Sequence, residues 1–251
     1  MLFHFSIFFW SGAFFLVMRF LAANDQLSFW ESYLSSVLFL AIISLVSAKK
    51  ITRRLRNSFI PLLLSVSAPS LIAFIDSPAE QYVFSLLSSG IFYIAFLALY
   101  RLRFVSSDET ARTFLSISAL SALFFFYAGE YGFYLNFDVP LATLVIAFAL
   151  GSCGAAYQTL YSALPRERSR VFLYALAIGF GMGEIGWVLS FWPFGYLTAG
   201  ATALSIFFVL WDMALSFFLG KLSRKRTLTY LFVSLFLIGL LIGTSPWRIQ
   251  V

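Results

Sequence analysis

The sequence is poor in the residues that build most metal and disulfide sites. It has one cysteine, Cys153, and one histidine, His4, in 251 residues. A disulfide scaffold needs paired cysteines, and zinc, haem and iron–sulfur sites draw their ligands mainly from cysteine and histidine. These classes are excluded, and we expect no metal and no cofactor. A partnered base for a catalytic nucleophile is also missing, so the sequence favours a protein that is not an enzyme.

Charge is scarce as well. Only 11% of the residues are charged, whereas an average soluble domain has about a quarter. The chain is instead 61% hydrophobic and 20% aromatic, with a mean hydropathy of +0.91. A water-soluble domain of this length cannot bury so much apolar surface, and the aromatic content excludes a disordered chain. The composition therefore predicts an integral membrane protein.

Long apolar runs divide the chain into helices of membrane length. A hydrocarbon core about 30 Å thick requires roughly 20 apolar residues, because backbone groups in lipid must bond within their own helix. We expect one all-α domain over residues 1–251, a polytopic transmembrane helix bundle of about nine spans. The predicted spans are 2–22, 29–48, 57–75, 81–100, 113–131, 139–161, 171–190, 197–220 and 227–244. The count becomes eight if the first segment is not a true span, since Ala22-Ala23 resembles a cleavage site.

The basic residues fall into alternate loops. Fifteen of the 17 lie in the second, fourth, sixth and eighth loops, while the intervening loops carry acidic residues. Because cytoplasmic loops of membrane proteins are rich in lysine and arginine, this predicts a cytoplasmic amino terminus and an external carboxyl terminus. The net charge of +6 then indicates contact with anionic lipid and not with nucleic acid.

Two carboxylates interrupt the predicted spans. Charges inside a span are costly unless paired, protonated or hydrated, so Glu184 and Asp212 are candidate substrate or proton sites. We add Trp187 and Tyr127 as residues that could line a pocket with Glu184, and Glu130 at the end of the fifth span. For each acid, a protonated carboxyl with only a packing role remains the alternative.

Glycines form a smooth face on the seventh span. Gly179, Gly183 and Gly186 recur every three or four residues, and small residues at this spacing let helices approach closely. The sixth span carries a matching patch that includes Gly151 and Gly154. We predict that these two spans pack tightly together.

The stretch from Glu184 to Gly195 resembles a recurring motif of an uncharacterised family of bacterial multi-pass membrane proteins, known only as a domain of unknown function. The motif has a glutamate, a tryptophan three residues later, and then Leu-Ser-Phe and Pro-Phe before the next helix. The resemblance implies a bacterial inner-membrane location and supplies no activity.

Two functional hypotheses remain open. The first is a transporter or binding protein for a small or lipidic solute that uses a buried carboxyl. The second is a non-catalytic subunit or scaffold that binds other membrane helices and anionic lipid. A membrane enzyme with a lipid-linked substrate is the weakest hypothesis, because only Glu130 and Asp138 lie together at a membrane face.

Overall fold

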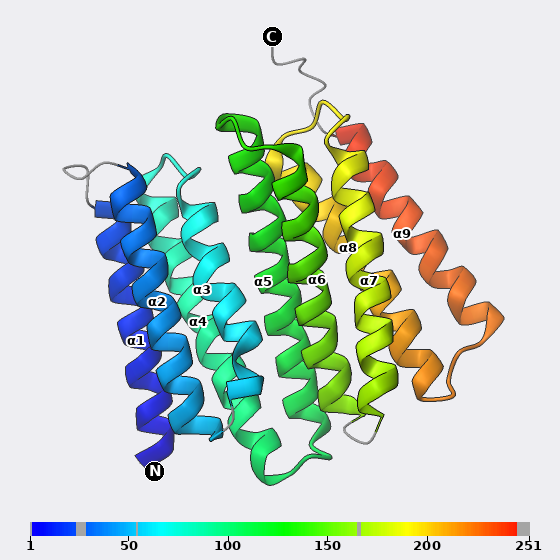
Figure 1. The fold of residues 1–251 in the computed structure, drawn as a ribbon, viewed down its shortest axis with the longest axis horizontal. Helices are drawn as coiled ribbons and strands as arrows, with labels where there is room; N and C mark the ends of the chain where they lie inside the picture. Colours follow the sequence, from blue (N-terminus) through cyan, green and yellow to red (C-terminus); the bar gives the residue numbers. More distant parts are fainter. Residues whose placement is uncertain (1, 24–28, 54, 165–166, 245–251) are drawn as a thin grey trace. The chain divides into compact units, whose positions relative to one another are not determined.

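The protein is described in a computed structural model, over residues 2–23, 29–53, 55–164 and 167–244 (Figure 1). All regular elements in these ranges are helices, which confirms the all-helical fold. The helices are α1 (Leu2–Ala23), α2 (Phe29–Thr52), the 3₁₀ helix η1 (Leu55–Ser58), α3 (Phe59–Ile72), α4 (Pro78–Phe104), α5 (Glu109–Asn136), α6 (Leu141–Ala163), α7 (Arg168–Leu189), α8 (Tyr196–Phe218) and α9 (Arg224–Thr244).

The number of clear membrane spans is lower than the nine that the sequence predicts. Seven helices in the described ranges are long and apolar enough to cross a membrane: α1, α2 and α4 to α8. The other two predicted spans contain shorter apolar helices, Phe59–Ile72 and Thr227–Gly239. Helix α3 is shorter than the predicted span because its first residues form the 3₁₀ helix η1 and because the helix ends at Ile72, before the loop that leads to Pro78. Together η1 and α3 rise about 29 Å, close to the hydrocarbon thickness.

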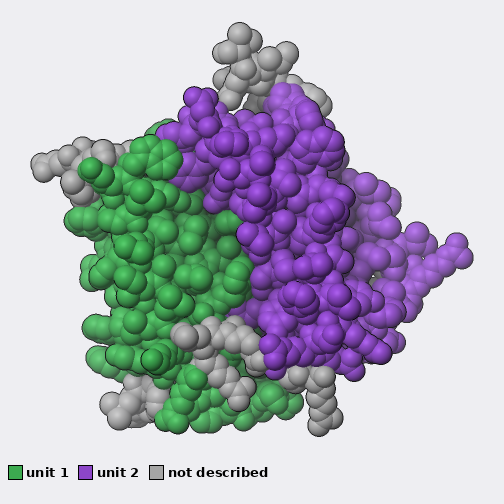
Figure 2. Space-filling view, in the orientation of Figure 1, with its two compact units in different colours: residues 1–126 green, residues 127–251 purple. Residues whose placement is uncertain are grey.

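The chain forms two compact units, residues 1–126 and 127–251 (Figure 2). The division falls inside α5. Each unit is a helical bundle. This division does not test the prediction of one domain over residues 1–251. We describe the units one at a time.

In unit 1, aromatic rings fill the space between α1 and α4. Phe14 of α1 stacks on Phe92 of α4 with ring centroids 4.6 Å apart, and neither ring is exposed. At one end, the Arg19 guanidinium lies 5.3 Å from the centre of the Tyr82 ring. The first predicted span is therefore a helix that packs into unit 1.

Serine hydroxyls join α2 to α3 in the same unit. The Ser65 hydroxyl lies 2.5 Å from that of Ser44 and donates to the Pro61 carbonyl at 2.9 Å. Tyr33 and Ser70 make a similar contact at 2.8 Å. Such contacts connect helices in a membrane, where hydrophobic attraction between helices is absent.

In unit 2, the glycines of α7 lie directly against α6. A Cβ atom at Gly179 would be 2.6 Å from the Cys153 Cβ and 2.7 Å from the Ala149 carbonyl oxygen. A Cβ at Gly183 would be 3.2 Å from Ala149, and one at Gly186 would be 2.9 Å from the ring of Phe148. The α7 backbone thus touches α6 where the three glycines remove side chains.

The surface of α6 that receives these glycines differs from the one expected. Their nearest atoms belong to Val145, Phe148, Ala149 and Cys153. Gly151 is buried and Gly154 half-buried, but neither supplies those atoms. The sequence pattern shows which helices carry small residues, and the structure adds that the glycine face of α7 meets alanine, valine and cysteine side chains.

The outer surface is apolar, unlike that of a soluble protein, while the interior combines apolar side chains with small polar ones. Large apolar residues cover the outside, among them Phe8, Leu86 and Phe180, which are 69%, 56% and 70% exposed. Small polar residues such as Ser88 and Ser152 are fully buried. Exposed apolar surface of this extent is compatible with lipid as the surrounding medium.

Apart from Arg19, the basic residues described in each unit gather at one end. In unit 1, Arg103 at the end of α4 donates to the Ile51 carbonyl at the end of α2, over 2.9 Å. Arg101 pairs with Asp108 at 2.8 Å. In unit 2, Tyr174 near the start of α7 contacts Phe218 at the end of α8, with ring centroids 4.8 Å apart. This contact places Arg168, the first residue of α7, at the same end as Lys221 in the loop after α8.

The α6–α7 contact predicts the effect of adding one methyl group. We expect Gly179→Ala to lower the free energy of unfolding by about 1–3 kcal/mol, because the new Cβ overpacks the contact with Cys153 and Ala149. Gly181→Ala is the matched control, since no atom lies within 4 Å of its Cβ position, and it should be neutral or stabilising by up to about 1 kcal/mol. Denaturant titration of both variants in detergent checks this, and equal stabilities would contradict the packing.

Candidate functional site

Glu184 lies on the outer surface of α7 and not in its buried seam. Its side chain is exposed, and so is Trp187 one turn later, at 50%. The described residues offer the Glu184 carboxyl no hydrogen-bond donor and no cation. Five residues separate Glu184 from the end of α7 at Leu189, a rise of about 8 Å, so it lies within the apolar length of the helix.

Asp212 has a different setting on α8. It is half-buried, and the Ser216 hydroxyl one turn later donates to its Oδ2 atom at 3.3 Å. Asp212 lies sixteen residues, about 24 Å, from the start of α8, whereas Glu184 lies near the end of α7 that the same loop joins. The two carboxylates are therefore at different depths, and they do not form one acid pair.

Tyr127 belongs to the interior of unit 2. It is fully buried, and its hydroxyl lies 2.6 Å from the Ser152 hydroxyl of α6. Tyr131, one turn later, donates to the Leu189 carbonyl at 2.8 Å and so holds the end of α7 against α5. Glu130 lies between these two tyrosines in the sequence, and its side chain is half-buried. Trp187 is exposed, as Glu184 is, whereas Tyr127 is buried against Ser152 and Phe148 of α6.

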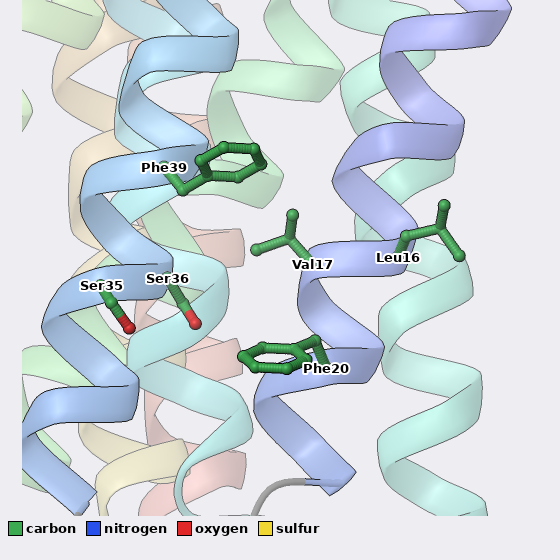
Figure 3. Close-up of a pocket in the computed structure, with 6 residues that line it drawn as sticks. All are labelled: Leu16, Val17, Phe20, Ser35, Ser36 and Phe39. Carbon is green, nitrogen blue, oxygen red and sulfur yellow. The ribbon is translucent and has the colours of Figure 1, made fainter. Parts of the chain in front are cut away.

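A groove between α1 and α2 of unit 1 is a better-formed candidate site. It encloses about 490 Å³, within the range of about 300–1,000 Å³ that small-molecule sites have. Leu16, Val17 and Phe20 of α1 and Phe39 of α2 form its apolar walls, and Val17 and Phe20 project toward the opposite helix (Figure 3). Leu16, Phe20 and Phe39 are 68%, 56% and 55% exposed, so the groove opens sideways to the surface.

Two serines of α2 give the groove its polar part. Ser35 is exposed, and its hydroxyl donates to the Ser32 carbonyl at 3.1 Å. Ser36 is 3% exposed and lines the groove, and its hydroxyl has no hydrogen-bond partner among the residues that the structure describes. The Ser32 hydroxyl, one turn earlier and 4% exposed, also has no partner. Buried hydroxyls in a low-dielectric medium normally have a partner, so Ser36 offers a free hydrogen bond to a molecule in the groove.

The sequence analysis missed this groove for a physical reason. Most serines in transmembrane helices bond to a carbonyl three or four residues earlier, as Ser47 does to Ile43 at 2.6 Å. A serine that leaves this pattern cannot be recognised from its neighbours in sequence. The available signal was the spacing of Ser32, Ser35 and Ser36, which places three hydroxyls on adjacent positions of one helix.

The described residues contain no cluster of the side chains that usually bind metal ions. No group of three or more histidine, cysteine, aspartate or glutamate side chains there could hold a metal ion. Cys153 packs against Gly179 at the α6–α7 contact.

Seven apolar helices of membrane length, with apolar side chains outward and hydroxyls inward, define a helical integral membrane protein. The chain belongs to the family described as "protein of unknown function (DUF5656)", whose model matches residues 11–244. This confirms the resemblance to an uncharacterised family. No curated protein and no solved structure gives a significant match.

The Tyr127 contact predicts a packing role that can be measured. Tyr127→Phe removes the hydroxyl that bonds to Ser152 and should lower the free energy of unfolding by about 1 kcal/mol. Tyr134→Phe is the control, because the Tyr134 hydroxyl has no hydrogen bond among the described residues, and its effect should stay within about 0.5 kcal/mol. The two variants are compared by thermal unfolding in detergent; a silent Tyr127→Phe would show that the buried contact contributes nothing.

Proposed function

We propose that the protein binds a lipidic molecule in the groove between α1 and α2. The observation that carries the proposal is the combination of apolar walls with the unpartnered hydroxyl of Ser36. An aliphatic chain fits against Leu16, Val17, Phe20 and Phe39, and a carbonyl or hydroxyl of the same molecule bonds to Ser36. The unpartnered Ser36 hydroxyl suits a neutral or weakly polar group, because the described residues that line the groove carry no charge.

The position of the groove agrees with a ligand that arrives from the bilayer. Ser36 lies seven residues, about 10 Å, from the start of α2, and Phe20 lies about 5 Å from the end of α1. These helix ends are joined by the first loop. A molecule with its polar group near Ser36 and its chain along Val17 and Leu16 would therefore lie in the same half of the membrane as that loop. The sideways opening gives direct access from lipid.

This proposal changes one part of the first hypothesis. The sequence singles out Glu184 as the central contact of a solute site, whereas the groove lies in unit 1 and is lined by serines. The exposed, unpartnered position of Glu184 favours instead the second hypothesis, a surface that binds another membrane helix.

For orientation, we propose a cytoplasmic amino terminus and an external carboxyl terminus, in the inner membrane of a bacterium. The support is the gathering of basic residues at one end of each unit, where they would also attract anionic lipid.

A second groove, of about 380 Å³, lies at the start of α7 and is lined by Arg168, Ser169, Tyr157 and Phe172. It offers a cation and a hydroxyl at the height expected for lipid headgroups.

Photolabelling tests the α1–α2 groove. We expect a long-chain fatty alcohol with a terminal diazirine to label peptides of α1 and α2 in the reconstituted full-length protein. Val17→Trp fills the groove and should reduce this labelling by roughly tenfold, the effect of about 1.4 kcal/mol of lost binding free energy. Val83→Trp, at a 54% exposed position of α4, is the matched control and should leave labelling unchanged. Equal labelling in both variants, or labelling confined to other helices, would contradict the site.

Cysteine accessibility tests the orientation. In a Cys153→Ala background, Asp76→Cys and Ser107→Cys place single thiols in the loops at the two ends of α4. Asp76→Cys should react with a membrane-impermeant maleimide in intact cells, and Ser107→Cys only after the cells are opened. The reverse pattern would invert the proposed topology.

A further inference from the structure

The groove at the start of α7 brings a cation together with two hydroxyls and two aromatic rings. Arg168 and Ser169 come from the first turn of α7, Phe172 from its second turn, and Tyr157 from α6. The rings of Tyr157 and Phe172 meet edge to face with centroids 6.2 Å apart, so α6 and α7 form the two walls. This groove belongs to unit 2, whereas the α1–α2 groove belongs to unit 1.

The neighbouring acid does not neutralise the cation in this groove. Glu167 pairs instead with Arg170, whose Nη1 atom lies 3.5 Å from the Glu167 Oε2 atom. Among the described residues, Arg168 has no ion pair, and neither the Ser169 nor the Tyr157 hydroxyl has a hydrogen bond. Arg168 and Ser169 are exposed, so a ligand can reach both. A guanidinium beside two hydroxyls, all able to donate hydrogen bonds, suits an oxyanion such as phosphate.

The depth of the groove indicates a lipid as the source of the phosphate. Arg168 is the first residue of α7, and Tyr157 lies six residues, about 9 Å, before the end of α6. The cation is therefore at the level of the headgroups, and the aromatic rings are at the edge of the hydrocarbon. Leu173 and Leu176, 60% and 52% exposed, follow Ser169 along α7 at helical spacing. An acyl chain attached to the phosphate can lie along these leucines, whereas a free phosphate ion would leave them uncovered.

We propose that this groove binds the phosphate of an anionic phospholipid, with Arg168 as its main contact. The planar guanidinium matches two phosphate oxygens, and the Ser169 and Tyr157 hydroxyls donate to the others. The site prefers a headgroup without an ammonium group, such as phosphatidylglycerol. An ammonium would face the positive charge of Arg168, and the neighbouring Glu167 is already paired. The site requires neither a lipid in the α1–α2 groove nor a particular orientation of the chain.

Photolabelling with defined lipids tests the ligand. The full-length protein is reconstituted in phosphatidylcholine vesicles with a trace of phosphatidylglycerol that carries a diazirine next to its acyl ester. We expect label on the end of α6 and the start of α7, and roughly tenfold less from a phosphatidylcholine probe of the same design. Equal labelling by the two probes would overturn the preference. Excess inorganic phosphate, compared with chloride at equal ionic strength, should leave the label unchanged; loss of label would show that the groove takes free phosphate instead.

A matched pair of variants separates this site from general charge attraction. Arg168→Gln removes the guanidinium from the groove and should reduce labelling by phosphatidylglycerol roughly tenfold. Arg224→Gln removes the same charge from the exposed first residue of α9, outside the groove, and should change labelling by less than about twofold because solvent screens distant charges. Both variants should unfold in detergent at the wild-type temperature, since both arginines are exposed. Equal losses of label in the two variants would refute the site.

Discussion

The structure depends on the rule that polar groups within a membrane must find partners inside the protein. Backbone groups satisfy it by forming helices, and this explains why all the regular elements described are helical. Side chains satisfy it by local or interhelical hydrogen bonds, as in Ser44 with Ser65 and Tyr127 with Ser152. Because lipid is as apolar as leucine, contacts between helices rely on close packing and on such bonds, and this accounts for the glycine face between α6 and α7.

The same rule identifies candidate binding sites, because a polar group without a partner in the protein can bond to another molecule. Most buried hydroxyls have a partner, so the few that do not are conspicuous. Among the described residues, the Ser36 hydroxyl has no partner in a groove with apolar walls, and the Glu184 carboxyl has none on an apolar surface. The first arrangement suits a lipidic ligand and the second suits another membrane helix. They lie in different units, so the two original hypotheses about function describe two surfaces of one molecule and are not exclusive.

Much of the fold could be predicted because it follows from composition and periodicity. Apolar length located the helices, and glycine spacing identified α6 and α7 as close neighbours. The predictions were weaker where the outcome depends on three-dimensional detail. The 3₁₀ helix η1 shortened one predicted span, and charge alone could not show that Glu184 faces outward. The groove at Ser36 escaped prediction because a serine's hydrogen bond depends on its rotamer and its neighbours in space.

An experimental structure of the full-length protein in lipid nanodiscs would test the lipid-binding account most directly. The account predicts elongated non-protein density between α1 and α2, along Val17 and Phe20, with a polar atom within hydrogen-bond distance of the Ser36 hydroxyl. A groove closed by direct contact of Phe20 with Phe39, with the Ser36 hydroxyl bonded to its own helix, would contradict it.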